Sequence, residues 1–528
     1  MTTIKILLFT LCIFSIAHAE VITDGSLGAK VELPGKDFHI TPELGQQFGG
    51  NLFHSFQNFN LSESETATFS GANSVQNVIA RVTGGQASTI DGTLRSTIPN
   101  ADLYFLNPYG ILFGKNAKLD LQGGFHASTA DYLRLQDGGR FDARTPNNSL
   151  LTVAPVTAFG FLTDSPAAIT TQDSQLAVAN GKTFSWIGGE LEFRGSETPI
   201  HDEGVYGNGG PTLEGYSWLL ADAGRFNLAS VASSGEVILT ATDLELQAKG
   251  GNILVLNTDL TTHHNEGGGG SIFIRGGQLE VINSEINSNT LTQPGGVIDI
   301  QVDNLTLKGK DIHASIESDT YGTGAGGSIH LKVAEKLNLT WAGILVDSYS
   351  DQPQAGAAGN LTIQAREVNL KDAAWLSTAT FSSGHGGTLS LQVAETLTIS
   401  GIDEVGYSGG IYARSHNEEL ENAGAAGNLI IQARNVKLAD GARLMSSTHG
   451  TGQGGTLSLQ VAETLTISDG GISVDTENSV LEKAGNAGNL TIQARDVELT
   501  NGAQLGSSTF GSGKGGMFSI IVILNDIR

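Results

Sequence analysis

The sequence predicts an all-β fold, a right-handed parallel β-helix that extends as a solenoid, with a capped N-terminal module followed by irregular repeats. Three observations favour this class. The chain has 528 residues, more than one compact core usually holds. Its 70 Gly, 11 Pro and 6% aromatic residues suit many short strands and tight turns. Near-exact repeats recur along its second half, which is typical of a solenoid.

Residues 1–19 have the pattern of a signal peptide. Lys5 supplies a positive start, residues 6–16 an apolar core, and Ala17-His18-Ala19 a small-residue cleavage site. A retained membrane anchor is the alternative, but the apolar stretch is shorter than the roughly 20 residues that span a bilayer. We therefore expect an exported protein that keeps no integral membrane segment after cleavage.

Cysteine content and charge narrow the possible partners. The one cysteine, Cys12, lies inside the predicted signal peptide, so the mature chain has no thiol and forms no disulfide. Its stability must come from stacked strands. Acidic residues number 54 against 29 basic ones. This excess disfavours nucleic acid and anionic lipid as partners.

Two related repeat units alternate in the second half of the chain. The segment GGTLSLQVAETLTIS occupies residues 386–400 and 454–468, and AGNL-type units begin at Ala358, Ala426 and Ala487. A glycine opens each unit, and we expect it there because corner residues often need positive φ. The predicted openings are Gly235, Gly270, Gly296, Gly327, Gly359, Gly387, Gly427, Gly455, Gly488 and Gly516.

Within a unit, apolar and polar residues alternate with the period of a strand that has one buried face. Leu389, Leu391 and Val393 follow this alternation, which would bury Glu395 if it continued. We therefore expect a bend at residues 394–396, a second short strand, and then a third strand such as residues 471–474. Three strands and their corners describe one coil of a parallel β-helix.

The first half carries different motifs. Residues 49–61 read GGNLFHSFQNFNL, residues 77–94 NVIARVTGGQASTIDGTL, and residues 101–121 ADLYFLNPYGILFGKNAKLDL. Further stretches are FGFL, WIGGELEF and LASVASSGEV. Together they resemble the haemagglutination-activity, or two-partner-secretion, domain that begins filamentous haemagglutinins and related exoproteins. The resemblance covers nearly all of residues 20–237.

The resemblance implies export through a dedicated outer-membrane β-barrel pore with periplasmic recognition domains. The chain would pass the pore unfolded and coil up as it emerges. The residues that the resemblance assigns to recognition of this partner are Asn51, Phe53, Phe56, Asn77, Arg81, Asn107, Pro108 and Gly110. The alternative for each of them is that it shapes or caps the β-helix.

One position departs from the family pattern. Family members usually carry Asn-Pro-Asn-Gly at a tight turn, and here Tyr109 replaces the second Asn. We expect the turn at residues 107–110 to survive. The substitution puts in doubt any partner contact that this Asn makes in the family.

The motifs and repeats divide the chain. We expect a signal peptide at 1–19, the two-partner-secretion domain at 20–252, a repeat rod at 253–514, and an atypical last coil at 515–528. In that coil Ile521 aligns with Gln392 and Leu524 with Glu395, so polar positions become apolar. We expect a shortened version of a longer exoprotein, and the alternative is a tail that folds over and seals the rod.

Few side chains suggest chemistry. The segments 201–203 (His-Asp-Glu) and 263–266 (His-His-Asn-Glu) are dense in possible metal ligands, but both fit solvated turns better than a site. We predict no metal and no cofactor. Glu395 and Glu463 recur with the repeat, which argues for solvated corners. The equivalent residues Asn360, Asn428 and Asn489 could form hydrogen-bonded ladders or hold left-handed turns.

The sequence thus favours a secreted or surface-exposed adhesin-type protein that reaches the outside through the periplasm and outer membrane. Besides the pore, a host or cell-surface glycan or protein is the expected ligand. We predict that the chain is not an enzyme. The alternative is a carbohydrate-active β-helix enzyme, a polysaccharide lyase or glycosidase, since fold alone does not exclude catalysis. Such an enzyme should show one irregular coil with clustered acids.

Overall fold

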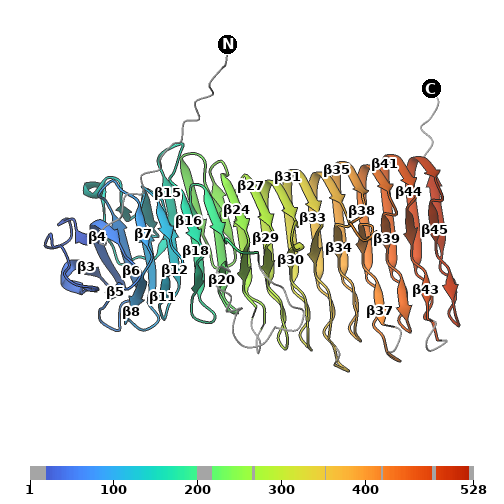
Figure 1. Ribbon diagram of the computed structural model, residues 1–528, viewed down its shortest axis with the longest axis horizontal. Helices are drawn as coiled ribbons and strands as arrows, with labels where there is room; N and C mark the ends of the chain where they lie inside the picture. Colours follow the sequence, from blue (N-terminus) through green and yellow to red (C-terminus); the bar gives the residue numbers. More distant parts are fainter. Residues whose placement is uncertain are drawn as a thin grey trace, which may run out of the picture.

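The computed structural model describes residues 20–198, 217–263, 268–350, 352–417, 420–478 and 483–522, which form one elongated stack of β-coils (Figure 1). The predicted all-β parallel β-helix is confirmed. Within these ranges the helical elements are two short 3-10 turns, η1 (Pro42–Leu44) and η2 (Pro146–Asn148), and no helix is long and apolar enough to cross a membrane. The predicted signal peptide and the segment 201–203 lie outside the described residues.

One main sheet of 23 strands runs the length of the rod. Most of its N-terminal strands are short and most of its C-terminal strands are long. The N-terminal ones, all of three to six residues except the ten-residue β4, are β1 (Glu20–Thr23), β3 (Gly45–Phe48), β4 (Asn51–Asn60), β6 (Asn77–Val82), β7 (Ser88–Ile90), β9 (Asp102–Leu106), β10 (Ile111–Phe113), β12 (Phe125–Ser128), β16 (Ile169–Gln172), β18 (Thr183–Gly188), β19 (Leu191–Arg194), β21 (Arg225–Ser230), β24 (Asn252–Leu256), β26 (Ser271–Arg275) and β27 (Gln278–Ile282). The later ones are β29 (Val297–Lys308), β31 (Ser328–Thr340), β33 (Asn360–Lys371), β35 (Thr388–Ser400), β38 (Asn428–Ala439), β41 (Thr456–Ser468), β44 (Asn489–Thr500) and β47 (Phe518–Val522).

A second parallel sheet faces the main sheet across the core. It contains β17 (Gln175–Ala177), β20 (Ser217–Leu220), β25 (Thr258–Thr261), β28 (Glu285–Asn287), β30 (Ala314–Glu317), β32 (Ala342–Leu345), β34 (Trp375–Ser377), β36 (Gly410–Tyr412), β39 (Arg443–Met445), β42 (Gly471–Ser473) and β45 (Gln504–Gly506). Two four-stranded sheets complete the coils at either end. They are β2 (Asp37–Ile40), β5 (Thr66–Phe69), β8 (Thr93–Ser96) and β11 (Lys118–Asp120), and β37 (Ser415–Asn417), β40 (Thr448–Gly450), β43 (Thr476–Glu477) and β46 (Thr509–Phe510).

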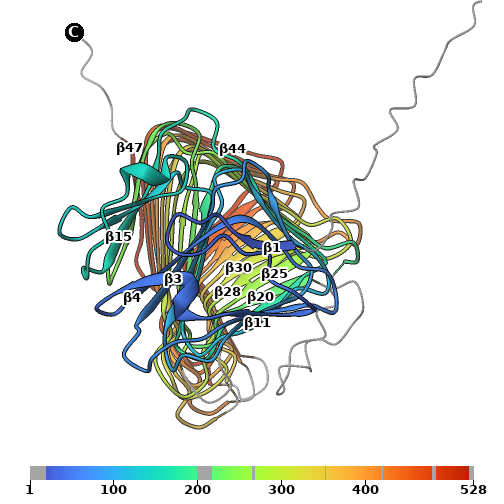
Figure 2. The ribbon, with the colours of Figure 1, turned by 90° about the vertical axis from the view of Figure 1, so that its left-hand side faces the viewer.

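A third layer covers only the N-terminal part of the main sheet. This cover sheet is antiparallel and consists of β13 (Tyr132–Leu135), β14 (Arg140–Asp142), β15 (Val156–Phe161), β22 (Gly235–Leu239) and β23 (Leu244–Gln247). In Figure 2 β15 lies outside the outline of the coils. Antiparallel strands also begin the rod, where β1 and β3 pair with β4. These edges are thereby paired, as natural sheets require.

The expected bend at residues 394–396 is a bulge inside one strand, so the prediction of two separate strands there was wrong. Strand β35 is continuous, but Ala394 and Glu395 together stand opposite the single Arg434 of β38. The bulge interrupts the alternation at Glu395, which stays half-buried, and Leu397 beyond it points into the core like Val393. The chain therefore bends without losing its backbone pairing.

The nine opening glycines from Gly270 onward are needed for close packing, and positive φ is the wrong explanation for them because none of the nine has it. Gly235 differs, with a φ of 150°. Gly387 has no left-handed φ, and a Cβ added to it would lie 1.7 Å from the carbonyl oxygen of Gly359. The same distance separates a Cβ on Gly359 from the Gly327 oxygen. From Gly270 onward each predicted opening lies just before a main-sheet strand. Gly235 does not, because it lies in β22 of the cover sheet.

Two kinds of contact hold the coils together. Inward-facing apolar side chains form a continuous core from Val21 to Ala494. Asn360, Asn428 and Asn489 each accept a hydrogen bond from a backbone N–H of the next coil, at 3.0, 3.1 and 3.1 Å. None of the three has a left-handed φ. These asparagines thus act as rungs of a ladder and do not hold turns.

Candidate functional site

The residues that the sequence assigned to partner recognition lie where the cover sheet meets the main sheet. A second apolar cluster fills this interface, separate from the core of the coils. The main sheet contributes its outward-facing side chains to it, among them Phe53, Ile79 and Ile187, and the cover sheet contributes Phe141 and Phe159. The N-terminal module therefore has two hydrophobic layers, and the main sheet lies between them.

Asn51 and Asn77 occupy adjacent coils at the start of β4 and β6. The Asn77 amide donates to the Asn51 Oδ1 at 2.8 Å. The Asn51 amide in turn donates to the backbone oxygens of Thr152 and Ala154, at 3.1 and 2.8 Å. Asn51 is buried and Asn77 is half-buried. The pair thus attaches the loop between β14 and β15 to the main sheet.

Phe53 and Phe56 lie on opposite faces of β4. The Phe53 ring lies 5.0 Å from the Phe141 ring of the cover sheet. The Phe56 ring lies inside the coil, 5.0 Å from the Phe59 ring. Both side chains are fully buried, so each packs one of the two hydrophobic layers and neither is available to a partner on the folded module.

Arg81 is a buried cation that joins three parts of the module. Its guanidinium donates to the hydroxyls of Ser55, Ser149 and Ser26 at 2.8, 2.7 and 3.0 Å, and to the backbone oxygen of Asp142. It also stacks 4.3 Å from the centre of the Phe141 ring. Burial lowers the pKa of Arg81 to about 10, which leaves it charged at neutral pH.

The tight turn at residues 107–110 survives the Tyr109 substitution. The buried Asn107 amide donates to the Gln86 backbone oxygen and to the Ser88 hydroxyl, both at 3.0 Å, and its Oδ1 accepts from the Tyr109 N–H at 3.0 Å. Gly110 has a φ of 118°, which a side chain would oppose.

The neighbouring side chain of Arg144 connects this turn to the cover sheet. It donates to the backbone oxygen of Pro108 at 3.4 Å, pairs with the buried Asp131, and lies 5.2 Å from the centre of the Tyr109 ring. Pro108 is itself buried. Tyr109 is therefore accommodated in the turn by a contact with this cation.

One exposed segment beside these residues was missed by the sequence analysis. Leu150 and Val153 are 62% and 67% exposed on the loop between β14 and β15. Asn51 holds this loop at Thr152 and Ala154, and Arg81 holds it at Ser149. Exposed apolar side chains that lie together on a surface can form part of an interaction site. Their sequence signal was weak because they belong to no repeat and no family motif.

Buried carboxyl groups in the second sheet and just beyond the ends of its strands were also missed. Burial raises the pKa of Glu285 and Asp319 well above the usual range, and that of Asp347 to about 6. Asp319 accepts from the Asp347 N–H at 2.5 Å, and Asp347 accepts from the Ala379 N–H at 2.6 Å. These carboxyl groups join successive coils. All three are at least nine-tenths buried, so a polymeric substrate has no access to them.

Of the possible metal ligands at residues 263–266, His263 lies within the described residues. His263 Nδ1 lies 3.2 Å from the backbone oxygen of Asn289, and residues 264–266 lie outside the described part of the chain. Over the residues that the structure describes, no group of three or more His, Cys, Asp or Glu side chains is placed to hold a metal ion.

Comparisons with known proteins match the first half of the chain to a family. Residues 19–259 match a family model described as "TPS secretion domain". A similar solved structure is the crystal structure of the HMW1 secretion domain from Haemophilus influenzae, with 14% sequence identity and a TM-score of 0.40; the alignment covers 95% of this chain and 98% of that one. No curated protein matches.

Proposed function

Because residues 19–259 match the model of the TPS secretion domain, we propose that this chain is exported across the outer membrane through a partner pore that recognises its N-terminal module. The module corresponds to residues 20–252, and the repeats at 253–514 form the exposed rod of an adhesin-type protein at the cell surface or in the medium. The family match is the observation that carries this proposal. The matched family is described by secretion and not by catalysis, so we favour an adhesin over an enzyme.

The proposed recognition surface is the loop that carries Leu150 and Val153. The family-matched residues Asn51 and Arg81 are buried and bind this loop through its backbone and Ser149. They therefore act as positioning residues, and the exposed apolar side chains supply the contact. A few buried apolar anchors carry most of the affinity of a typical interface.

The test is a secretion assay on the full chain, expressed together with the outer-membrane transporter of the source genome. The double variant Leu150→Asp/Val153→Asp places two charges in the proposed interface. Both side chains are exposed, so the fold should tolerate the change. We expect at least about tenfold less protein in the medium, with the chain accumulating in the periplasm.

A matched control uses two equally exposed apolar side chains of the rod. Val405 and Tyr407 are 77% and 71% exposed, and Val405→Asp/Tyr407→Asp should be secreted like the wild type. Equal secretion of the two double variants would refute the loop as recognition surface. The rest of the proposed export route would then need another contact surface on the module.

A further inference from the structure

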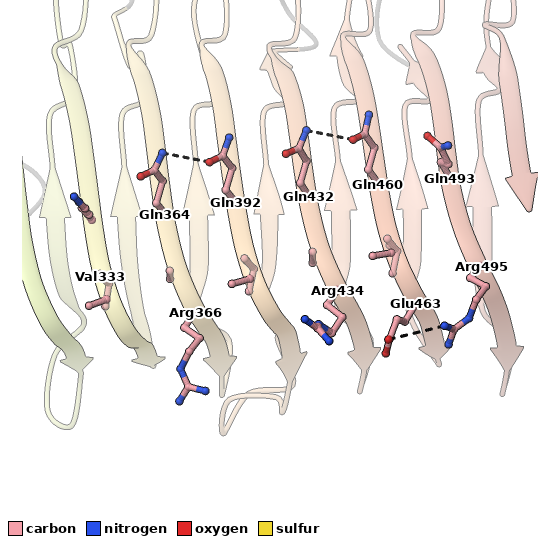
Figure 3. A pocket seen from close by; sticks show the side chains of 18 residues that line it. Val333, Gln364, Arg366, Gln392, Gln432, Arg434, Gln460, Glu463, Gln493 and Arg495 are labelled. Atoms are coloured by element: carbon pink, nitrogen blue, oxygen red, sulfur yellow. Dashed lines mark hydrogen bonds and ion pairs between the residues drawn. The ribbon is translucent and has the colours of Figure 1, made fainter. Parts of the chain in front are cut away.

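The rod carries a shallow trough along the outward face of the main sheet, where the long strands bend (Figure 3). The trough runs from β31 to β44 and has a volume of about 1030 Å³. Small side chains such as Ala365, Val393 and Ala433 lie at its floor. Toward the N-terminal module it meets a smaller hollow of about 320 Å³ that reaches β23 of the cover sheet. The trough thus begins where the cover ends.

One wall of the trough is a row of glutamine side chains from successive coils. Its members are Gln364, Gln392, Gln432, Gln460 and Gln493. The Gln364 amide donates to the Gln392 oxygen at 3.2 Å, and the Gln432 amide donates to the Gln460 oxygen at 3.2 Å (Figure 3). Between these described side chains, no bond joins Gln392 to Gln432.

This pairing leaves polar groups free for a ligand. Each bonded pair keeps an NH2 group that does not bond within the pair at one end and a free amide oxygen at the other. A continuous amide ladder would serve only to stabilise the stack. An interrupted ladder instead presents one donor and one acceptor for every two coils.

The other wall has charges that cancel. Coils with a bulge carry a glutamate there and the next coil carries an arginine. The Arg366–Glu335, Arg434–Glu395 and Arg495–Glu463 pairs have N–O distances of 2.7, 3.2 and 3.9 Å. The charge pattern therefore repeats every two coils, as the glutamine pairs do, and most of the trough is close to neutral.

The repeat length selects among polymers. Two coils span roughly 9 to 10 Å, because neighbouring strands lie about 4.8 Å apart. An extended peptide advances about 3.3 Å per residue, so one repeat holds about three residues and successive repeats would face opposite ways. A peptide strand also binds at a sheet edge, which this face does not offer. A polyanion is also disfavoured, because the arginines of the trough are already paired with glutamates and the chain has a net charge of -25.

We propose that the trough binds an uncharged linear polysaccharide that lies along the rod axis. Two rings of an extended glycan match the two-coil repeat, and its hydroxyl groups both donate and accept hydrogen bonds, as the glutamine pairs require. This inference rests on the proposed function, since it names the ligand class of the adhesin-type rod.

The test is calorimetry with the purified mature chain and a panel of uncharged hexasaccharides: cellohexaose, laminarihexaose, maltohexaose, mannohexaose and chitohexaose. At least one should bind, more tightly than its disaccharide, and with an affinity that does not change with salt. Gln392→Ala/Gln432→Ala removes one amide from each bonded pair. Its affinity should fall at least about tenfold, because two hydrogen bonds to the ligand are lost.

The control replaces two exposed glutamines outside the trough, Gln136→Ala/Gln504→Ala, and should bind like the wild type. Three outcomes would overturn the proposal: no binding across the panel, unchanged affinity in the trough variant, or salt-dependent binding of heparin or polygalacturonate alone. Binding is measured on purified protein and does not depend on export. Its failure would leave the secretion proposal untouched, and a failed secretion test would leave this one standing.

Discussion

The outward face of the main sheet changes its chemistry where the cover sheet ends. One column of residues in register along the rod reads Leu106, Ser128, Ile187 and Ala229 in the covered module and Gln364 and Gln432 in the open rod. The covered members are fully buried, and the open ones are exposed. The outward positions of a β-helix therefore indicate whether a second layer lies over them.

Exchanging residues within this column should give the largest effect. Ile187→Gln would bury an amide without partners and remove apolar contacts beneath the cover sheet. We expect a loss of about 3 to 5 kcal/mol in the stability of the module. The reverse change in the rod, Gln432→Ile, should stay within about 0.5 kcal/mol.

The measurement for both variants is hydrogen exchange on peptides from the two regions, which reports local opening free energies. Similar losses in the two variants would show that covered and open faces are equivalent. The outward-facing residues would then not indicate where a second layer covers the main sheet.

The tight turn of the module should give the next largest effect. Asn107→Ala removes three side-chain hydrogen bonds at a fully buried position. We expect a local loss of about 1 to 3 kcal/mol. We also expect reduced export with unchanged synthesis, measured by immunoblot of medium and cells.

Asn360→Ala is the matched control in the rod. It removes a single bond at an exposed position and should be exported normally. An Asn107→Ala protein that reaches the medium at the wild-type level would contradict the role given to this turn.

A fall in pH should weaken the module, and a rise in pH should weaken the rod. Burial lowers the pKa of His54 and His126 in the module to about 4. The module should therefore lose stability as the pH falls below about 6.5, the unfolded value. In the rod, burial raises the pKa of Asp347 to about 6. The stability that its protonated form contributes is present below about pH 4 and is lost as the pH rises through about 6.

Hydrogen-exchange protection factors measured from pH 4 to pH 8 should therefore rise with pH in the module and fall in the rod around Asp347. Asp347→Asn should reduce the response of the rod around this residue and leave that of the module unchanged. A response of the same sign in both regions would argue against this assignment.

The sequence predicts the fold of the rod better than that of the module. In the rod the outward face of each strand is exposed, so apolar residues such as Leu389 and Leu391 alternate with polar ones. This alternation predicts the strands of each coil directly. In the module, β9 is apolar on both faces and β18 is buried on both. This pattern is typical of strands that are buried on both sides. It was the one feature of the sequence from which a cover sheet could have been predicted.

The cover sheet itself could not be found from local patterns. Its strand β15 pairs with β22, which lies more than 70 residues further along the chain, and such pairing depends on the assembled coils. For the same reason the burial of Asn51 and Arg81 could not be predicted from the sequence. Their partners in the loop after β14 are brought near only by the fold. The raised pKa of Asp347 likewise arises from burial between coils, which no motif encodes.

The central claim is that the covered module directs the chain through a partner pore. The most direct measurement compares the amount of full-length chain in the medium of a Gram-negative host with and without the transporter of the source genome. We expect the chain in the medium only when the transporter is present. Release without the transporter, or complete retention with a functional one, would contradict it.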